Sequence, residues 1–291
     1  MKSPFDLDDQ ESYRRWRDAR MQPSTSELLP PVEIADPNAV AAVEGDAVLA
    51  RCRRHNMALY RLAGGEAMDK AALRRFAAAF GLRRLDSNLC ADDDGISALQ
   101  VRADGGRGAG DYIPYSDKPI NWHTDGYYNS PERRIRGMVL HCVEDAAEGG
   151  ENALLDPEIA YILLRDEDPG LIRALQRDDA MTIPANVVDG VELRPAVTGP
   201  VFSLVDGFLH MRYTARGRNV VWADDATLTA ARQRLTALLA DPANPHVVRY
   251  RLQPGEGLIC NNVLHNRSGF SDGGSHNRLL WRARFHDRIE E

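Results

Sequence analysis

The sequence contains few cysteines and no paired cysteine motif. Its four cysteines, Cys52, Cys90, Cys142 and Cys260, are scattered through 291 residues without a CxxC pair. This usage disfavours both a disulfide framework and a structural zinc knuckle, because each needs cysteines at a characteristic spacing. The fold must therefore rest on its hydrophobic core, and a reducing compartment fits best.

Long apolar runs and an excess of positive charge are also missing. The first residues, MKSPFDLDDQESYRRWRD, lack the apolar core of a signal peptide, and no later stretch is long enough to cross a bilayer. The formal net charge of -7 at pH 7 argues against non-specific binding to nucleic acid. We therefore expect a cytoplasmic protein with a small-molecule partner, no nucleic-acid or membrane partner, and homo-oligomerisation left open.

The composition, 43% hydrophobic and 27% charged, is typical of a globular chain with a sizeable core. Residues 1–45 are polar and contain several prolines, as in PSTSELLPPVEIADP. This segment predicts an N-terminal arm that is extended or partly disordered. Residues 46–291 are then the main domain.

Helix signals recur along this domain. Residues 69–80, DKAALRRFAAAF, space their apolar side chains along one helical face, with Asp69 as a candidate N-cap. Asp156-Pro157 and Asp168-Pro169 are typical helix starts. Residues 223–240 carry another apolar stripe. These patterns predict helices in at least three places.

The closing part of the chain is rich in strand signals. RGMVLHCVE, HVVRYRL, GLICNNVLHN and RLLWRARF are short, β-rich and bounded by turn formers, and PGEG between the second and third predicts a tight hairpin connection. These strands do not alternate regularly with helices, which disfavours a doubly wound parallel sheet. We therefore predict a mainly β fold with flanking helices, a jelly roll.

One His-x-Asp occurs in the chain, in NWHTDG at residues 121–126. About one His-x-acid pair is expected by chance among eight histidines, so the motif alone is weak. On a strand, however, His123 and Asp125 would point to the same face. His265 ends the β-like run GLICNNVLHN and offers a third ligand. Two histidines and one carboxylate leave three coordination positions open, as in non-haem Fe(II) oxygenases.

The run RLLWRARF has a mostly cationic and a mostly apolar face. Arg278, Arg282 and Arg284 stand at even positions, and the odd positions are apolar. If the electron donor for iron is 2-oxoglutarate, an arginine is suited to its far carboxylate. In a plain sandwich these arginines would be solvated. In a barrel covered outside by helices, they can line the cavity.

In their order and spacing, NWHTDG, RGMVLHCVE, EGGENALLD, VLHNRSGF and HNRLLWRARF resemble the taurine dioxygenase (TauD/TfdA-like) family of Fe(II)/2-oxoglutarate-dependent oxygenases. The resemblance runs from about residue 48 to 286. It implies a double-stranded β-helix jelly roll, with residues 46–291 as the catalytic domain. It also implies Fe(II), 2-oxoglutarate and O2 as cofactor and co-substrates.

Carried over to this chain, the resemblance makes His123, Asp125 and His265 the iron ligands. Arg278 would bind the 5-carboxylate of 2-oxoglutarate, and Arg282 an anionic group of the substrate. Asn152 stands in GGEN where relatives commonly have threonine, and its amide can still donate to 2-oxoglutarate.

Two further positions are weighed for the substrate. Tyr128, with Trp122 and Tyr127, would wall the substrate pocket or pack in the core. Arg212 would face the cavity or pair with surface acids.

The resemblance implies hydroxylation of a small, anionic substrate with release of succinate and CO2, and desaturation is the other oxidative outcome that the sequence leaves open. Two alternatives remain open from the sequence. One is a jelly-roll metalloenzyme that does not use 2-oxoglutarate, such as a cupin-type dioxygenase or isomerase. The other is a non-catalytic sensor relative that binds metal or co-substrate without turnover.

Overall fold

The computed structural model describes residues 3–22, 24–65, 68–87, 94–101, 113–274 and 277–289. The chain divides into two compact units. Unit 1 comprises Met1–Ser24, Trp122–Arg134 and Leu155–His246, and unit 2 comprises Thr25–Asn121, Ile135–Leu154 and Val247–Glu291. Cys90 lies outside the described residues, and the other three cysteines are buried free thiols. No helix in the described part of the chain is both long and apolar enough to cross a membrane.

Two sheets form the β framework. The six-stranded sheet has the order β1-β2-β16-β5-β19-β3, and the four-stranded sheet has the order β15-β7-β17-β4. Apart from the parallel pair β1–β2, the ladders of the larger sheet are antiparallel. The bounds are β1 Val32–Ile34, β2 Met57–Leu62, β3 Ser97–Leu99, β4 Ile120–His123, β5 Gly137–Glu144, β7 Asn152–Leu155, β15 Val248–Tyr250, β16 Glu256–Cys260, β17 Leu264–Arg267 and β19 Leu279–Phe285.

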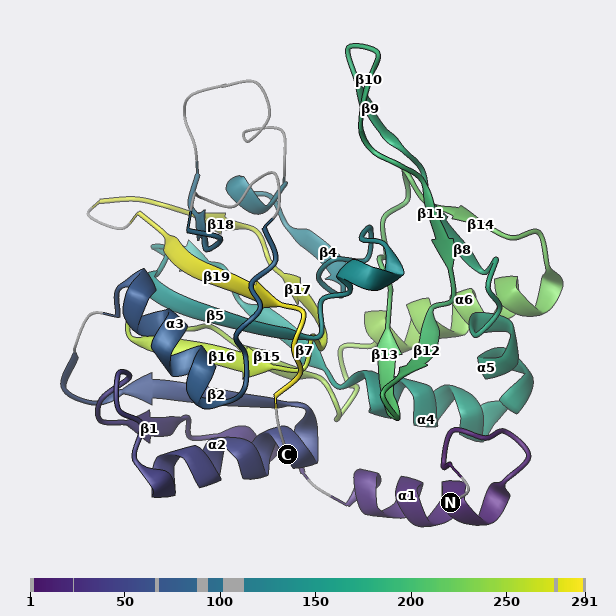
Figure 1. Cartoon of the computed structure of the whole chain (residues 1–291), viewed down its shortest axis with the longest axis horizontal. Helices are drawn as coiled ribbons and strands as arrows, with labels where there is room; N and C mark the ends of the chain where they lie inside the picture. The colour runs from purple at the N-terminus through teal and green to yellow at the C-terminus, as the bar shows by residue number, and fades with distance from the viewer. Residues whose placement is uncertain are drawn as a thin grey trace. The chain divides into compact units, whose positions relative to one another are not determined.

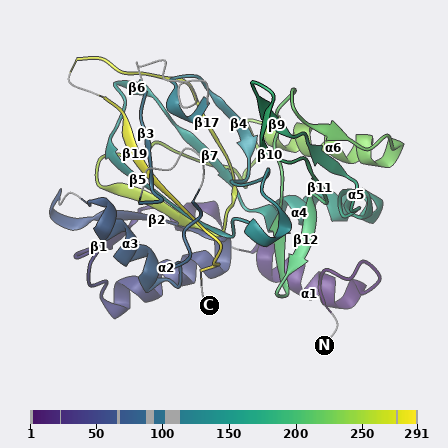
Figure 2. The same ribbon diagram turned by 45° about the horizontal axis from the view of Figure 1, so that its top comes forward.

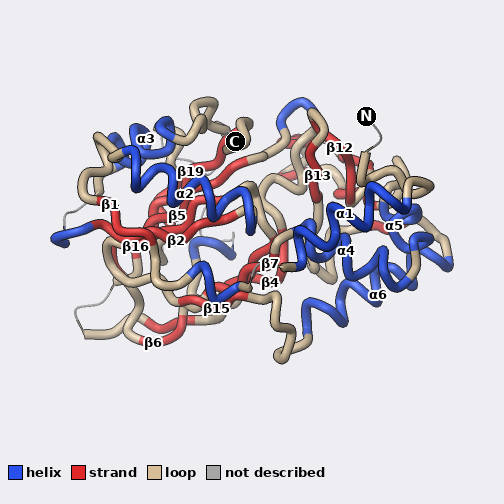
Figure 3. The backbone as a smooth tube through the Cα atoms, turned by 90° about the horizontal axis from the view of Figure 1, so that it is seen from below, coloured by secondary structure: helices blue, strands red, loops and turns tan. Residues whose placement is uncertain are grey.

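A hydrophobic core fills each side of the six-stranded sheet. One cluster joins side chains of β2, β5, β16 and β19 to Leu154 of β7 and Val248 of β15. The other packs the opposite face of the same sheet against α2 (Ala42–His55) and α3 (Lys70–Ala79). Figure 1 shows α2 and α3 against this sheet, and Figure 3 shows α3 and β15 on opposite sides of it. The layering agrees with the predicted jelly roll with flanking helices.

The faces of β19 follow from this layering. Trp281, Ala283 and Phe285 pack in the cluster that contains α2 and α3, whereas Leu280 packs in the cluster on the opposite face. The apolar odd positions therefore point to the covering helices. The covering helices thus lie on the apolar face of β19, and the lining of the cavity by its arginines stays a prediction.

The predicted helices form where their caps and apolar stripes indicated. In α3, the Asp69 carboxylate accepts from Ala72 N at 2.7 Å, and the stripe that includes Leu73 and Phe76 is buried. In unit 1, aspartates cap the next three helices in the same way. These are α4 (Pro157–Glu167), α5 (Pro169–Leu175) and α6 (Ala226–Ala240), capped by Asp156, Asp168 and Asp225.

The remaining strands are short. Unit 1 has a three-stranded sheet of order β11-β8-β14 and the two-stranded pairs β9–β10 and β12–β13, and β6 pairs with β18 in unit 2. The bounds are β6 Glu148–Gly149, β8 Met181–Ile183, β9 Asn186–Val188, β10 Val191–Arg194, β11 Val197–Gly199, β12 Phe202–Val205, β13 Phe208–Met211, β14 Val221–Trp222 and β18 Phe270–Ser271.

The predicted hairpin at PGEG is wrong. A turn does occur there, with Gly255 at φ 83, but β15 and β16 lie in different sheets and do not pair. The run GLICNNVLHN is likewise two strands, β16 and β17, interrupted where Asn262 adopts φ 51. The Asn262 side chain holds this break by donating to Ile135 O at 2.8 Å. Both turns carry the chain from one sheet to the other.

The N-terminal segment also differs from the prediction of an extended arm. Residues Gln10–Met21 form α1, whose N-cap Asp9 accepts from Ser12 N at 3.1 Å. Within unit 1, Tyr13 donates to Asp166 of α4 at 2.7 Å. The Arg165 guanidinium lies 3.7 Å from the centre of the Tyr13 ring and donates to Pro4 O and Asp6 O. These contacts make residues 3–21 an ordered part of unit 1.

Candidate metal centre

His123 and Asp125 lie where β4 ends and a turn begins. His123 is the last residue of β4, and its backbone forms an isolated antiparallel bridge with Thr214. Asp125 is already in the turn, which continues through Gly126 at φ 68. The sequence predicted both residues on one strand, but only the histidine is there. The turn, and not strand alternation, brings the carboxylate beside the imidazole.

The middle residue of the motif, Thr124, fixes this turn. Its backbone N donates to Tyr213 O at 3.0 Å, and its Oγ1 accepts from Tyr213 N at 3.1 Å. Thr124 is fully buried, so both bonds are shielded from water. Asn129 N donates to Gly126 O at 2.8 Å and closes the other end. Thr124 is therefore a positioning residue for the two side chains that flank it.

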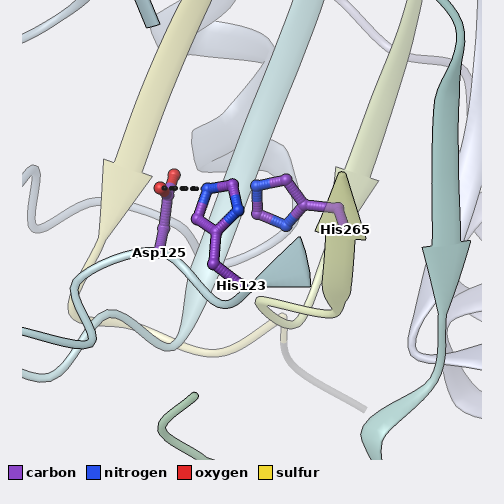
Figure 4. Close-up of side chains that lie close together, drawn as sticks. All are labelled: His123, Asp125 and His265. Carbon is purple, nitrogen blue, oxygen red and sulfur yellow. Dashed lines mark ion pairs between the residues drawn. The ribbon is translucent and has the colours of Figure 1, made fainter. Parts of the chain in front are cut away.

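The structure brings the three predicted metal ligands together. One ligand atom from each of His123, Asp125 and His265 lies within 4.8 Å of the other two. The His123 Nε2 atom is 3.8 Å from Asp125 Oδ1. Figure 4 shows the three side chains pointing toward one another. In the parts of the chain that are described, this is the one group of histidine, cysteine and acidic side chains with such a spacing.

His265 is oriented from within its own strand. Its Nδ1 is 2.9 Å from Val263 O. Because a carbonyl oxygen can only accept, Nδ1 carries the proton and Nε2 keeps a lone pair for a metal. The strand β17 has β4, which carries His123, as its neighbour, as Figure 2 shows. Two imidazoles and one carboxylate suit Fe(II) and leave coordination positions for co-substrates.

Arg278 is a buried cation whose guanidinium makes no hydrogen bond to a described residue. It is 4% exposed, and its guanidinium carbon lies 4.8 Å from the centre of the Phe270 ring. Its backbone N donates to Asp272 Oδ1 at 3.0 Å, but no described oxygen accepts a hydrogen bond from its guanidinium. Burial lowers the pKa of Arg278 below its usual value. A carboxylate ligand would compensate this charge.

The two glycines of EGGEN make room for Arg278 and its surroundings. Gly149 and Gly150 have φ values of 75 and 73, which side chains rarely adopt. A Cβ on Gly150 would lie 3.1 Å from Arg278 Nε, and a Cβ on Gly149 would lie 2.3 Å from Gly269 O. The predicted co-substrate residue Asn152 follows on β7, the strand beside β17. It is buried, and no described group is hydrogen-bonded to its side-chain amide.

The other arginines of β19 differ from Arg278 in their surroundings. Arg284 forms a buried ion pair with Asp86. Arg282 is half-buried and stands opposite Leu140 of β5. Arg278 precedes the strand, and the register with β5 shifts just after it. The extra residue at this shift is Val143 of β5, so β19 itself stays continuous and the common face of Arg278 and Arg282 remains a prediction.

A second buried arginine near Arg278 was missed in the sequence. Arg267 lies on β17, two residues after His265, and is 5% exposed. Burial, and to a smaller extent the charge of Arg278, lowers its pKa to about 9. The period-two relation to His265 is the one signal in the sequence that could have indicated it.

The aromatic residues after the ligands form a small cluster. Tyr127 is buried and meets the His123 ring edge-on, with the ring centres 6.4 Å apart. Tyr128 is half-buried, and its ring centre lies 5.1 Å from that of Tyr127. The Arg194 guanidinium carbon lies 5.7 Å from the centre of the Tyr128 ring. Trp122, the residue before His123 in the chain, is also buried. The substrate role of Tyr128 stays a prediction.

Arg212 holds the turn after the metal ligands. Its Nη1 donates to Tyr127 O at 3.2 Å and Val197 O at 3.3 Å, and Nη2 donates to Gly199 O at 3.0 Å and to Met181 O. Its Nε donates to Pro200 O at 3.4 Å. Burial, more than the nearby Arg134, lowers the pKa of Arg212 to about 10. All five N–H groups donate to backbone oxygens, which indicates a structural role, and the predicted substrate role stays untested.

We expect Arg212→Met to lower the free energy of unfolding by about 3 kcal/mol or more, because it leaves several buried carbonyls without a donor. Urea denaturation measures this change. Arg216→Met is the matched control: Arg216 is exposed and contacts Tyr127 only through its ring, 5.9 Å away. Its effect should stay below about 1 kcal/mol. A stable Arg212→Met protein that had lost substrate affinity would instead support the predicted substrate role.

A jelly roll that carries two histidines and one aspartate as a candidate iron site has the architecture of a non-haem iron oxygenase. The family model described as taurine catabolism dioxygenase TauD, TfdA family, matches residues 24–284. The chain belongs to this family.

Individual relatives agree with this assignment. The chain is 35% identical over 181 residues to a uridine-5'-phosphate dioxygenase from Streptomyces sp, a match that spans 58% of this chain and 64% of that protein. An asparagine oxygenase in complex with Fe(II), hydroxyasparagine and succinate has a similar fold, with a TM-score of 0.57, 15% identity and coverage of 95% and 92% of the two chains. The non-haem iron oxygenase OrfP with Fe and α-ketoglutaric acid has a TM-score of 0.60, 15% identity and coverage of 84% and 80%.

Proposed function

We propose that the protein is an Fe(II)- and 2-oxoglutarate-dependent dioxygenase that hydroxylates a small anionic substrate and releases succinate and CO2. The observation that carries this proposal is the cluster of His123, Asp125 and His265, with its ligand atoms within 4.8 Å of one another. The family match over residues 24–284 supports it. We further propose that the protein acts in the cytoplasm without a nucleic-acid or membrane partner.

The residues would divide the work as follows. His123, Asp125 and His265 would hold Fe(II), which supplies the oxidation of the substrate coupled to decarboxylation of 2-oxoglutarate. Arg278 would bind the distal carboxylate of 2-oxoglutarate, and the Asn152 amide would donate to the same co-substrate. Thr124 keeps the turn between the first two ligands rigid through its two bonds to Tyr213.

Succinate release tests the activity. The anaerobically purified, Fe(II)-loaded protein should convert 2-oxoglutarate to succinate, and the rate should rise when the right substrate is added. Iron-dependent oxygen uptake without a 2-oxoglutarate requirement would instead favour a cupin-type enzyme. Tight binding of iron and 2-oxoglutarate with no succinate for any compound would favour a sensor.

We propose a phosphorylated nucleoside as the first substrate to test. The motivation is the 35% identical relative, which is named for uridine-5'-phosphate. A phosphate would also satisfy the prediction of an anionic substrate. The panel should add asparagine and arginine, because the solved neighbours contain hydroxylated forms of them, together with sulfonates and simple carboxylates.

Arg282 is the proposed anchor for the anionic group of that substrate. Arg282→Ala should keep the slow, uncoupled decarboxylation of 2-oxoglutarate and lose at least about tenfold of the stimulation by substrate, because one charge-assisted hydrogen bond is removed. Succinate release with and without substrate measures both rates. Full stimulation in the variant, or a protein that only unfolds, would rule the anchor out and leave Arg282 as a structural residue of β19.

A further inference from the structure

Two buried arginines in unit 2 share one aromatic ring. The guanidinium carbons of Arg267 and Arg278 each lie 4.8 Å from the centre of the Phe270 ring. Arg267 is 5% exposed and Arg278 is 4% exposed. A ring face attracts a cation but does not neutralise it. Two positive charges with little access to solvent therefore lie next to the same ring.

Neither guanidinium has a carboxylate as a hydrogen-bond partner among the described residues. Arg267 uses Nη2 to donate to Ser116 O at 2.7 Å and to Lys118 O, and its buried Nε has no hydrogen-bond partner. Arg278 uses none of its side-chain donors. The charges of Asp117 and Asp272 act on Arg267 and Arg278 respectively, without a hydrogen bond to either guanidinium. Two buried like charges that lack a hydrogen-bonded anion are costly, and the cost falls when an anion binds between them. The pair thus favours an anionic group at this position.

The position of Arg267 relates this pair to the metal centre. On β17, Arg267 is two residues after His265, so the two side chains leave the same face of the strand. The strand rises about 3.3 Å per residue, which separates their origins by about 7 Å. A co-substrate held at His265 would therefore lie within range of the Arg267 charge.

We propose that Arg267 is a specificity residue of the co-substrate site, where it supplies a second positive charge that favours a dicarboxylate over a monocarboxylate 2-oxo acid. The inference rests on the proposed function, in which Arg278 alone binds the distal carboxylate. Arg267 adds attraction for that carboxylate, and its bonds to Ser116 O and Lys118 O keep the guanidinium in place.

The experiment compares two ligands that share a metal-chelating head. 2-Oxoglutarate has a distal carboxylate, and 2-oxopentanoate has the same chain length without it. Titration calorimetry on the Mn(II)-loaded full-length protein measures both dissociation constants without turnover. The ratio of the two constants, Kd for 2-oxopentanoate divided by Kd for 2-oxoglutarate, measures the contribution of the distal carboxylate in each variant.

Arg267→Met, which keeps the length and removes the charge, should lower this ratio by about tenfold through weaker binding of 2-oxoglutarate. Binding of 2-oxopentanoate should change by less than about twofold. Arg267→Lys keeps a charge and should retain the ratio within about threefold. Arg251→Met is the matched control, because Arg251 also donates to backbone oxygens but is paired with Asp145; it should leave the ratio unchanged.

The outcomes separate the inference from the proposed function. If Arg267→Met weakens both ligands equally, or if Arg267→Lys behaves like Arg267→Met, Arg267 only holds the backbone around Ser116 and the inference fails. If the ratio is unchanged while the parent decarboxylates 2-oxoglutarate, the inference fails and the proposed function stands. If the parent protein binds neither ligand, both are overturned.

Discussion

Replacing both His123 and His265 with alanine should abolish Fe(II) binding and 2-oxoglutarate turnover together. The double variant leaves Asp125 as the sole protein ligand of the cluster. Loss of an outer partner of a metal ligand already costs about ten- to a hundredfold in affinity or activity, so loss of two ligands should cost more than that. Iron content after desalting and succinate release measure the two effects.

His246→Ala serves as the control for this experiment. His246 lies in a different part of unit 1 and contributes no atom to the cluster. Its variant should bind iron like the parent. A double variant that still bound iron stoichiometrically and turned over 2-oxoglutarate at the parent rate would show that the metal assignment is wrong.

Arg278→Ala should raise the apparent KM for 2-oxoglutarate by about ten- to a hundredfold and leave iron binding largely intact. A lost charge-assisted hydrogen bond costs about 1.5–3 kcal/mol, which corresponds to this range. Steady-state succinate release at varied 2-oxoglutarate gives the constant, and Arg278→Lys should recover part of the affinity. An unchanged constant would move the role to another cation or argue against this co-substrate.

The local features of the fold could be predicted from the sequence because their causes are local. Asp69 caps α3 by accepting a hydrogen bond from Ala72 N, three residues later. The apolar stripe of the same helix determines which of its faces is buried. The alternation in RLLWRARF likewise marks the face of β19 that packs against α2 and α3. In each case, the residues that form the sequence pattern are also the ones whose interactions form the helix or strand.

Other features depend on partners that are distant in the chain. PGEG has the composition of a hairpin turn, but the choice between pairing β16 with β15 or with β2 depends on the cores of two sheets. Among the described residues, the acceptors of Arg212 are backbone carbonyls, which any sequence would provide, so no acidic side chain indicates its role. The position of Asp125 in a turn depends on Tyr213, which binds the intervening Thr124.

The docking of α1 has a consequence for the order of events during synthesis. Tyr13 and Asp166, which are hydrogen-bonded, are separated by 153 residues. At about 5–20 residues per second, a ribosome needs roughly 8–30 s to make the chain between them. A lone helix of this length is marginal in water. Phe5, Tyr13 and Trp16 therefore lack their partner side chains on α4 until that part of the chain has been made.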